Sequence, residues 1–235
     1  MQKVEIDFYK DSNPVINDAY DRLISRIPLL KQNSGNGLFT VTGCEPGVGS
    51  TTIAISIAVS LACSGWKTLL VDADMRKGPK QKRLSAEVQM GLSDCLEGKA
   101  GFTEVTCETN IEHLYYLSCG GETASPVVLL NSTNMDKFIA LISESYDYVI
   151  FDSSSLNTTI DAAIISAKTS GAILVAEYMQ TKRMKIEMAI RELEQTGAGV
   201  IGIVLNNVAK KDYKRYIENY DYFEANKRRK KPKSN

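Results

Sequence analysis

The residues of this chain best suited to chemistry form a glycine-rich turn between two apolar segments. The turn, VTGCEPGVGSTTI at residues 41–53, follows an apolar run at 38–41 and leads into AISIAVSLA. A strand, a glycine-rich turn and a helix in this order let backbone N–H groups surround a phosphate. Gly47 and Gly49 let the chain curl, and Thr51 stands where the hydroxyl of such a loop holds Mg²⁺. The usual pattern has lysine after the last glycine, whereas this chain has Ser50.

Three aspartates each close an apolar segment elsewhere in the chain. Asp72 and Asp74 end KTLLVDAD, and Asp152 ends YDYVIFD. A lone aspartate after a strand is most often the N-cap of a helix. In a parallel sheet, however, the carboxyl ends of the strands meet at one edge, where ligands bind. Three carboxylates beside a phosphate loop repel each other unless a cation lies among them, and Mg²⁺ with a nucleotide is the natural occupant.

Positioning these groups requires a sheet, and the hydrophobic pattern predicts one. Apolar runs typical of strands end at residues 41 and 72 and occupy 114–117, 148–152, 172–176 and 200–207. Helical spacing or composition is found at residues 18–30, 54–64, 93–97, 135–143, 160–168 and 182–195. Strands that alternate with helices predict a doubly wound α/β domain with a mostly parallel sheet. Continuous apolar strands predict that helices cover both faces.

Composition limits the alternatives. At 235 residues and 43% apolar content, we expect one large domain at residues 14–209, a polar, loosely held tail at 1–13 and a second tail at 210–235. Lysine plus arginine equals aspartate plus glutamate, 28 each, so the net charge does not indicate a polyanionic partner, and we expect no nucleic acid partner. Five cysteines without metal-ligand spacing indicate reduced thiols in a cytosol. The N-terminus has no secretory apolar region, and the apolar runs are shorter than the roughly 18 residues that span a bilayer.

The C-terminal tail combines tyrosines with a basic run, KRRKKPK. We interpret it as a mobile polar tail whose aromatic residues, on composition alone, are incidental. The basic run is most often a solvated segment, and it would contact anionic lipid only where a membrane partner holds it close. The predicted location is therefore the cytoplasm, with any membrane contact made through a partner or through this run.

Three segments carry a resemblance to a known family. PGVGSTT, LLVDADMRKG and YDYVIFD resemble the Walker A, Walker A′ and Walker B segments of bacterial tyrosine kinases (BY-kinases), which belong to the MinD/ParA-like P-loop ATPases. DAYDRL, GLSDCLEG, ASPVVLLNS and GIVLNN resemble further family segments, so that the resemblance covers roughly residues 14–210. It implies ATP and Mg²⁺ as cofactors, phosphoryl transfer to tyrosine, and a role in bacterial capsular or exopolysaccharide synthesis. For a chain this short, it also implies a membrane activator protein of polysaccharide export as partner, at the inner face of the cell membrane.

The resemblance also assigns roles to individual residues. Asp72 would accept the proton of the incoming tyrosine hydroxyl as the catalytic base. The nucleotide would be held by Gly47, Val48, Gly49, Ser50, Thr51, Thr52 and Asn206. The metal would be held by Thr51, Asp74 and Asp152. The phosphate acceptors would be the tail tyrosines Tyr213, Tyr216, Tyr220 and Tyr222.

The departures from the family pattern leave three hypotheses. Ser50 replaces the Walker A lysine, and Asp21 and Ile24 replace two arginines that the family uses in ring assembly. The first hypothesis is a catalytically weakened kinase, binding Mg·ATP weakly, that regulates a membrane partner, with an active kinase paralogue as a further partner. The second is an active tyrosine autokinase in which another cation, Arg76 or Lys77, replaces the lysine. The third is a ParA-like ATPase switch.

Overall fold

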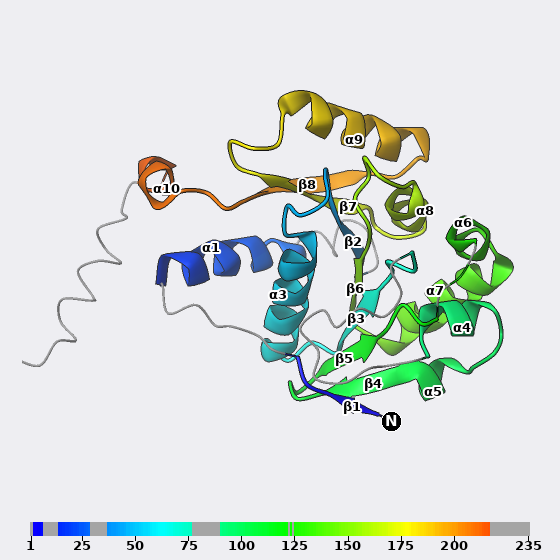
Figure 1. The fold of residues 1–235 in the computed structure, drawn as a ribbon. Helices are drawn as coiled ribbons and strands as arrows, with labels where there is room; N and C mark the ends of the chain where they lie inside the picture. Colours follow the sequence, from blue (N-terminus) through cyan, green and yellow to red (C-terminus); the bar gives the residue numbers. More distant parts are fainter. Residues whose placement is uncertain are drawn as a thin grey trace, which may run out of the picture.

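The computed structural model describes residues 2–6, 14–28, 37–76, 90–121, 123 and 125–216. The strands in this part are β1 (Lys3–Val4), β2 (Leu38–Gly43), β3 (Thr68–Asp72), β4 (Thr106–Thr109), β5 (Leu114–Leu117), β6 (Tyr148–Asp152), β7 (Ala172–Glu177) and β8 (Val200–Asn206). The helices are α1 (Pro14–Ile24), α3 (Ser50–Cys63), α4 (Leu92–Leu96), α5 (Phe102–Val105), α6 (Pro126–Leu130), α7 (Thr133–Ser145), α8 (Asp161–Ala167), α9 (Arg183–Gln195) and α10 (Lys210–Tyr216). The strands lie next to one another although they are far apart in sequence (Figure 1).

The strands form one mixed sheet in the order β1-β4-β5-β3-β6-β2-β7-β8. All neighbouring pairs are parallel except β4 and β5, which run antiparallel. Strands β2, β3 and β6 are buried along their whole length. The prediction of a doubly wound, mostly parallel sheet with covered faces is therefore confirmed.

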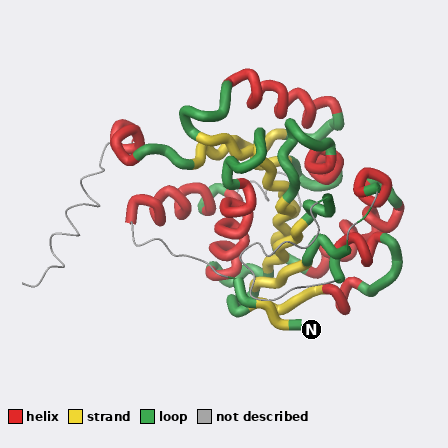
Figure 2. Tube along the Cα trace, viewed as in Figure 1, coloured by secondary structure: helices red, strands yellow, loops and turns green. Residues whose placement is uncertain are grey.

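Helices cover the two faces of this sheet in separate groups. One face packs against α3 and α1, whereas α7 and α4 cover the middle of the other face, and α8 and α9 cover its β7–β8 end (Figure 1). The α3 side has a core that includes Phe39, Ile57 and Ile150, and the opposite side has a core that includes Leu69, Phe138 and Phe151. Figure 2 shows the same strands enclosed between these helices. This packing fixes the carboxyl edge of the sheet as the surface for ligands.

Most of the predicted elements are present with small shifts at their ends. The helix after the glycine-rich turn ends at Cys63, followed by Gly65 with a φ of 88°, as its C-cap glycine predicted. The first helix begins at Pro14 and ends at Ile24, earlier than the predicted span of 18–30. In the part of the chain that the structure describes, no helix is long and apolar enough to cross a membrane.

Two segments expected as loose tails contain regular structure. Residues 3–4 form β1, which pairs in parallel with β4, and Ile6 is buried beyond it. The alternating apolar residues Val4 and Ile6 supply a buried face that the polar composition of the segment concealed. Residues 210–216 form α10, so the expectation of a mobile tail from Lys210 does not hold for this first part. The domain boundaries themselves stay a prediction.

Truncating one core side chain tests the packing. Phe151 on β6 is fully buried, so we expect Phe151→Ala to lower the free energy of unfolding by about 3–5 kcal/mol. Leu141→Ala is the control, because Leu141 lies on the outer side of α7 with 45% of its surface exposed. Surface changes of this kind stay within about 0.5 kcal/mol. Urea unfolding measures both values, and equal losses would contradict the packing.

Candidate active site

The glycine-rich turn lies directly after β2 and ends at the first residue of α3. Gly47 and Gly49 have φ angles of 84° and 90°, in the left-handed region that other residues rarely adopt. Ser50, Thr51 and Thr52 then form the first turn of α3, where backbone N–H groups have no partner within the helix. The predicted nucleotide-binding residues 47–52 therefore form one continuous anion-binding turn.

Asn206, at the end of β8, contacts this turn across the sheet. Its side-chain amide donates a hydrogen bond to the carbonyl of Val48, with an N–O distance of 2.9 Å. A Cβ atom placed on Gly49 would lie 2.3 Å from the same amide nitrogen. The contact of Asn206 in this structure is thus with the turn that would bind phosphate, and its expected contact with the nucleotide base stays a prediction.

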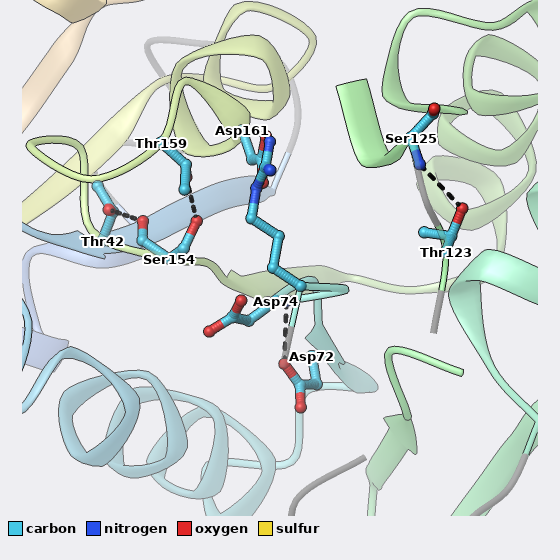
Figure 3. Close-up of polar contacts among 9 residues, drawn as sticks. Thr42, Asp72, Asp74, Thr123, Ser125, Ser154, Thr159 and Asp161 are labelled. Atoms are coloured by element: carbon cyan, nitrogen blue, oxygen red, sulfur yellow. Dashed lines mark hydrogen bonds and ion pairs between the residues drawn. The ribbon is translucent and has the colours of Figure 1, made fainter. Parts of the chain in front are cut away.

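The three aspartates lie together at the carboxyl edge of the sheet. Asp72 and Asp152 are register partners on the neighbouring strands β3 and β6, and they are 4% exposed each. Asp74 is 3% exposed, and its backbone N–H donates to Asp72 Oδ1 at 3.1 Å. Figure 3 shows Asp72 and Asp74 rising from the same turn. The register of β3 and β6 thus brings Asp152 to the same edge as Asp72 and Asp74, which lie far from it in sequence.

A small pocket opens beside these carboxylates on the α3 face. Its polar wall is made by Thr51, Asp72 and Asp152, and its other lining residues are Ile6, Ile55, Leu70 and Tyr116. The sequence analysis missed Tyr116, which is next to Leu70 in the β3–β5 register. The alternation of the LYYL strand could have placed it on the same face as Leu70 and Asp72. Burial and then the Asp72 carboxylate raise the pKa of the Tyr116 phenol above its usual range, so this hydroxyl stays protonated.

Arg76 forms a paired contact that the sequence did not reveal. Its Nε and Nη2 atoms donate to the two carboxylate oxygens of Asp161 at 2.6 and 2.8 Å. Asp161 is the first residue of α8 and is 1% exposed. The hydrogen bonds to Asp161 raise the pKa of Arg76. This ion pair connects the turn after β3 to the helix after β6.

Hydrogen bonds also fix the segment after Asp152. Thr42 donates to the carbonyl of Ser154 at 2.7 Å, and the hydroxyls of Ser154 and Thr159 are 2.5 Å apart (Figure 3). Backbone bonds from Ser153 to Val41 attach the same segment to β2. In Figure 3, Ser125 and Thr123 form a separate contact to one side of this group. The segment after Asp152 is therefore held against the strand that precedes the glycine-rich turn.

The side chains at this edge suit a magnesium ion that is shared with phosphates. No group of three or more His, Cys, Asp or Glu side chains among the described residues could hold a metal by itself. The hydroxyl of Thr51 and the carboxylate of Asp152 nevertheless line the same pocket, and the buried hydroxyl of Ser153 has no hydrogen-bond partner among the described residues. Mg²⁺ typically takes few protein oxygens and completes its shell with phosphate and water. These residues fit such an ion.

Two of the predicted acceptor tyrosines belong to α10 and do not line the pocket. Tyr213 is a half-buried residue of α10, and Tyr216 is the last residue of that helix. Tyr220 and Tyr222 lie outside the described residues. The described tyrosine at the pocket is Tyr116 instead.

Cys44, the first residue of the turn, is a buried thiol. Burial, and after it the neighbouring Glu45, raises the pKa of Cys44 to about 11. A thiol reacts through its thiolate, and at pH 8 a pKa of about 11 leaves about one thiolate in a thousand. Cys44 therefore packs within the turn as an inert side chain.

Together, the parallel sheet, the anion-binding turn before α3 and the carboxylates at the same edge define a P-loop nucleotide-binding protein. A family model described as "AAA domain" matches residues 39–196, more than half of the chain. "Tyrosine-protein kinase CpsD" of Streptococcus pneumoniae serotype 4 is 37% identical over 194 residues, which cover 81% of this chain and 84% of that protein. The chain therefore belongs to the family of bacterial tyrosine-protein kinases.

Solved structures agree with this assignment. The chimerical protein CapA2B2 superposes with a TM-score of 0.78 at 27% identity, over 88% of this chain and 93% of that chain. The kinase domain of the Escherichia coli tyrosine kinase ETK superposes with a TM-score of 0.78 at 26% identity, over 83% of this chain and 76% of that chain. The predicted resemblance to BY-kinases is confirmed.

Two glycine substitutions test the support that Asn206 gives to the turn. We expect both Gly47→Ala and Gly49→Ala to lower the free energy of unfolding by about 1–2 kcal/mol, because both force a positive φ. The loss for Gly49→Ala should be about 1–3 kcal/mol larger, because the added Cβ meets the Asn206 amide. A Cβ added at Gly47 has no atom within 4 Å among the described residues. Urea unfolding gives the difference. Equal values would show that Asn206 does not pack on the turn.

Thiol labelling tests the state of Cys44. At pH 8 we expect iodoacetamide to label the exposed Cys63 at least about tenfold faster than Cys44. Labelling of Cys44 should rise as the pH approaches its pKa of about 11, because the thiolate fraction rises with pH. Peptide mass spectrometry measures each rate. Fast labelling of Cys44 at pH 8 would mean a reactive thiolate in the turn.

Proposed function

We propose that this chain is a cytosolic, BY-kinase-like P-loop protein of bacterial capsular or exopolysaccharide synthesis. It acts with a membrane activator protein of the export machinery, which brings it to the inner face of the membrane. It binds Mg·ATP weakly and transfers phosphate slowly, so its contribution is mainly regulatory. The supporting observations are the family membership, the carboxylates at the sheet edge and the residue at position 50.

Ser50 is the observation that carries the proposal. It is the first residue of α3, directly after Gly49, at the position where the P-loop pattern has lysine. A lysine there neutralises the β- and γ-phosphates, whereas a serine hydroxyl donates one hydrogen bond and offsets no charge. Removing one donor at a developing charge lowers the rate about 10²–10³-fold. Cations that stabilise phosphoryl transfer contribute about 10³–10⁵-fold.

Arg76, one of the two cations suggested to replace the lysine, is already in an ion pair. Arg76 is held by both oxygens of Asp161, a carboxylate that is 1% exposed. Moving Arg76 to a phosphate would leave this buried carboxylate without its guanidinium, which is unfavourable. Lys77, the other candidate, lies outside the described residues. This supports the view that the positive charge missing at position 50 is not replaced by Arg76.

The remaining site residues suit transfer to a tyrosine hydroxyl. Gly47 to Thr52 would hold the phosphates through backbone N–H groups, and Thr51, Asp74 and Asp152 would hold Mg²⁺. A bound Mg²⁺ would neutralise phosphate charge. Asp72, buried beside them, would accept the hydroxyl proton. The acceptors would be the tail tyrosines at 213, 216, 220 and 222, phosphorylated by this chain or by an active kinase paralogue.

One observation favours a second candidate, an active tyrosine autokinase. The chain retains all three carboxylates and is 37% identical to a protein named a tyrosine-protein kinase. A ParA-like ATPase switch has no comparable support, because it shares this fold with the kinases and no observation favours it over them. The two kinase proposals differ in rate, and one substitution separates them.

Ser50→Lys is the decisive variant. If the site lacks only its cation, we expect the lysine to raise tyrosine phosphorylation at least tenfold, the lower part of the range for such groups. The measurement is incorporation of labelled phosphate from ATP into the protein, with mass spectrometry to locate phosphotyrosine.

Asp72→Asn in the Ser50→Lys protein is the control, since it keeps the size of the side chain and removes the base. It should cancel the gain. If the native chain already phosphorylates its tail and Ser50→Lys brings no improvement, the weakened-kinase proposal is wrong and the autokinase stands.

A further inference from the structure

The N-terminal segment, residues 2–6, is attached to the far end of the sheet by few contacts. Its two-residue strand β1 pairs with β4, and the N–H of Glu108 donates to the carbonyl of Gln2 at 2.9 Å. Beyond β1, the backbone of Ile6 is hydrogen-bonded to the side chain of Asn110. The Ile6 N–H donates to Asn110 Oδ1 at 2.8 Å, and Asn110 Nδ2 donates back to the Ile6 carbonyl at 3.4 Å.

Ile6 is the residue of this segment that reaches the candidate active site. Its side chain is 3% exposed and lines the pocket whose polar wall is Thr51, Asp72 and Asp152. These are the residues proposed to bind the metal and accept the proton. A group in this pocket therefore lies beside the Asp72 carboxylate, which is proposed to accept the hydroxyl proton.

The pocket lining suits an occupant other than isoleucine. Ile55 and Leu70 present aliphatic surface, and Tyr116 presents an aromatic side chain. The carboxylates at the polar wall accept hydrogen bonds, which an isoleucine side chain cannot donate. A phenol offers both an apolar ring for the aliphatic wall and a hydroxyl donor for the carboxylates. The lining thus fits a tyrosine side chain better than the residue that fills it.

We propose that the N-terminal segment closes the acceptor side of the active site. Ile6 occupies the place of the acceptor tyrosine ring and must leave before a tyrosine can enter. This inference rests on the proposed function, because it takes Asp72 as the group that receives the tyrosine proton. It goes further in naming the chain's own residues 2–6 as the competitor.

The attachment of the segment suits a removable cover. The strands that carry pocket residues, β3, β5 and β6, are four or five residues long and have two neighbours each, whereas β1 has two residues and one neighbour. Such short edge pairing opens at low free energy compared with the core. Releasing the Asn110 side chain would break two hydrogen bonds to the Ile6 backbone.

Peptide binding tests the inference without any kinase activity. The probe is a synthetic peptide of residues 210–222. It is added to protein with ¹³C-labelled isoleucine methyl groups, and binding is measured from the NMR chemical shifts of these methyl groups. We expect Ile6→Ala and Asn110→Ala to bind it at least about fivefold more tightly than the native chain, with the shift seen at Ile55. Ile111→Ala is the matched control, because Ile111 is adjacent to Asn110 and packs on the same core but does not line the pocket.

For a peptide with phenylalanine in place of its tyrosines, Ile6→Ala and Asn110→Ala should increase the affinity less, because this peptide offers no hydroxyl to the carboxylates. Equal affinities for native chain, Ile6→Ala and Asn110→Ala, or peptide shifts that leave Ile55 unmoved, would overturn the proposal. Circular dichroism establishes that each variant is folded.

Kinetics in the Ser50→Lys background separate this inference from the proposed function. There, Ile6→Ala should lower the KM for the peptide at least about fivefold and leave kcat within about twofold. If Ser50→Lys shows no activity while Ile6→Ala still tightens peptide binding at Ile55, the proposed function fails and the cover stands. If Ser50→Lys is active and Ile6→Ala changes neither KM nor binding, the cover is wrong and the proposed function stands.

Discussion

The in-register parallel pairing of three central strands is the constraint on which the site depends. Asp72, Asp152 and Val41 lie in one row across β3, β6 and β2, so the carboxylates and the start of the glycine-rich turn reach the edge at the same level. Shifting β6 by one residue would turn Asp152 to the opposite face of the sheet. The packing on both faces disfavours this shift, because it would exchange Ile150 and Phe151 between two cores that are packed around them. The two helical layers therefore secure the geometry of the site as well as the stability of the fold.

The charges along this edge indicate what the chain has retained. Three buried carboxylates remain, Ser50 adds no positive charge, and the guanidinium of Arg76 neutralises Asp161. A bound nucleotide would bring further negative charge to the same edge. Without a fixed cation, neutralisation falls mainly to Mg²⁺, so nucleotide binding to such a site depends strongly on the metal. The carboxylates proposed to hold a metal and to accept a proton are present, whereas position 50 has no lysine to neutralise the phosphates.

The sequence predicted the parts of the fold whose signals are local. Continuous apolar runs located β2, β3, β6 and β7, and the strand–turn–helix order located the glycine-rich turn. The missed parts depend on long-range contacts. Strand β1 pairs with β4 across more than a hundred residues, and the Arg76–Asp161 pair spans 85 positions. Neither has a sequence period, since a two-residue strand and a single ion pair leave none. Tyr116 could have been found only by knowing that β5 lies beside β3.

The two unusual features of the site act on different reactants. Ser50 lies at the start of α3, in the turn proposed to hold the phosphate donor, whereas Ile6 lines the pocket proposed to receive the acceptor. A missing cation weakens stabilisation of the transferring group and lowers kcat, whereas a cover competes with the tyrosine and raises its KM. The shared wall of Thr51, Asp72 and Asp152 lies between them. A partner that draws residues 2–6 away would thus open the acceptor side but leave the charge deficit at Ser50. Activation by a partner alone would then give tyrosine binding without fast transfer, which is the behaviour of a regulatory subunit.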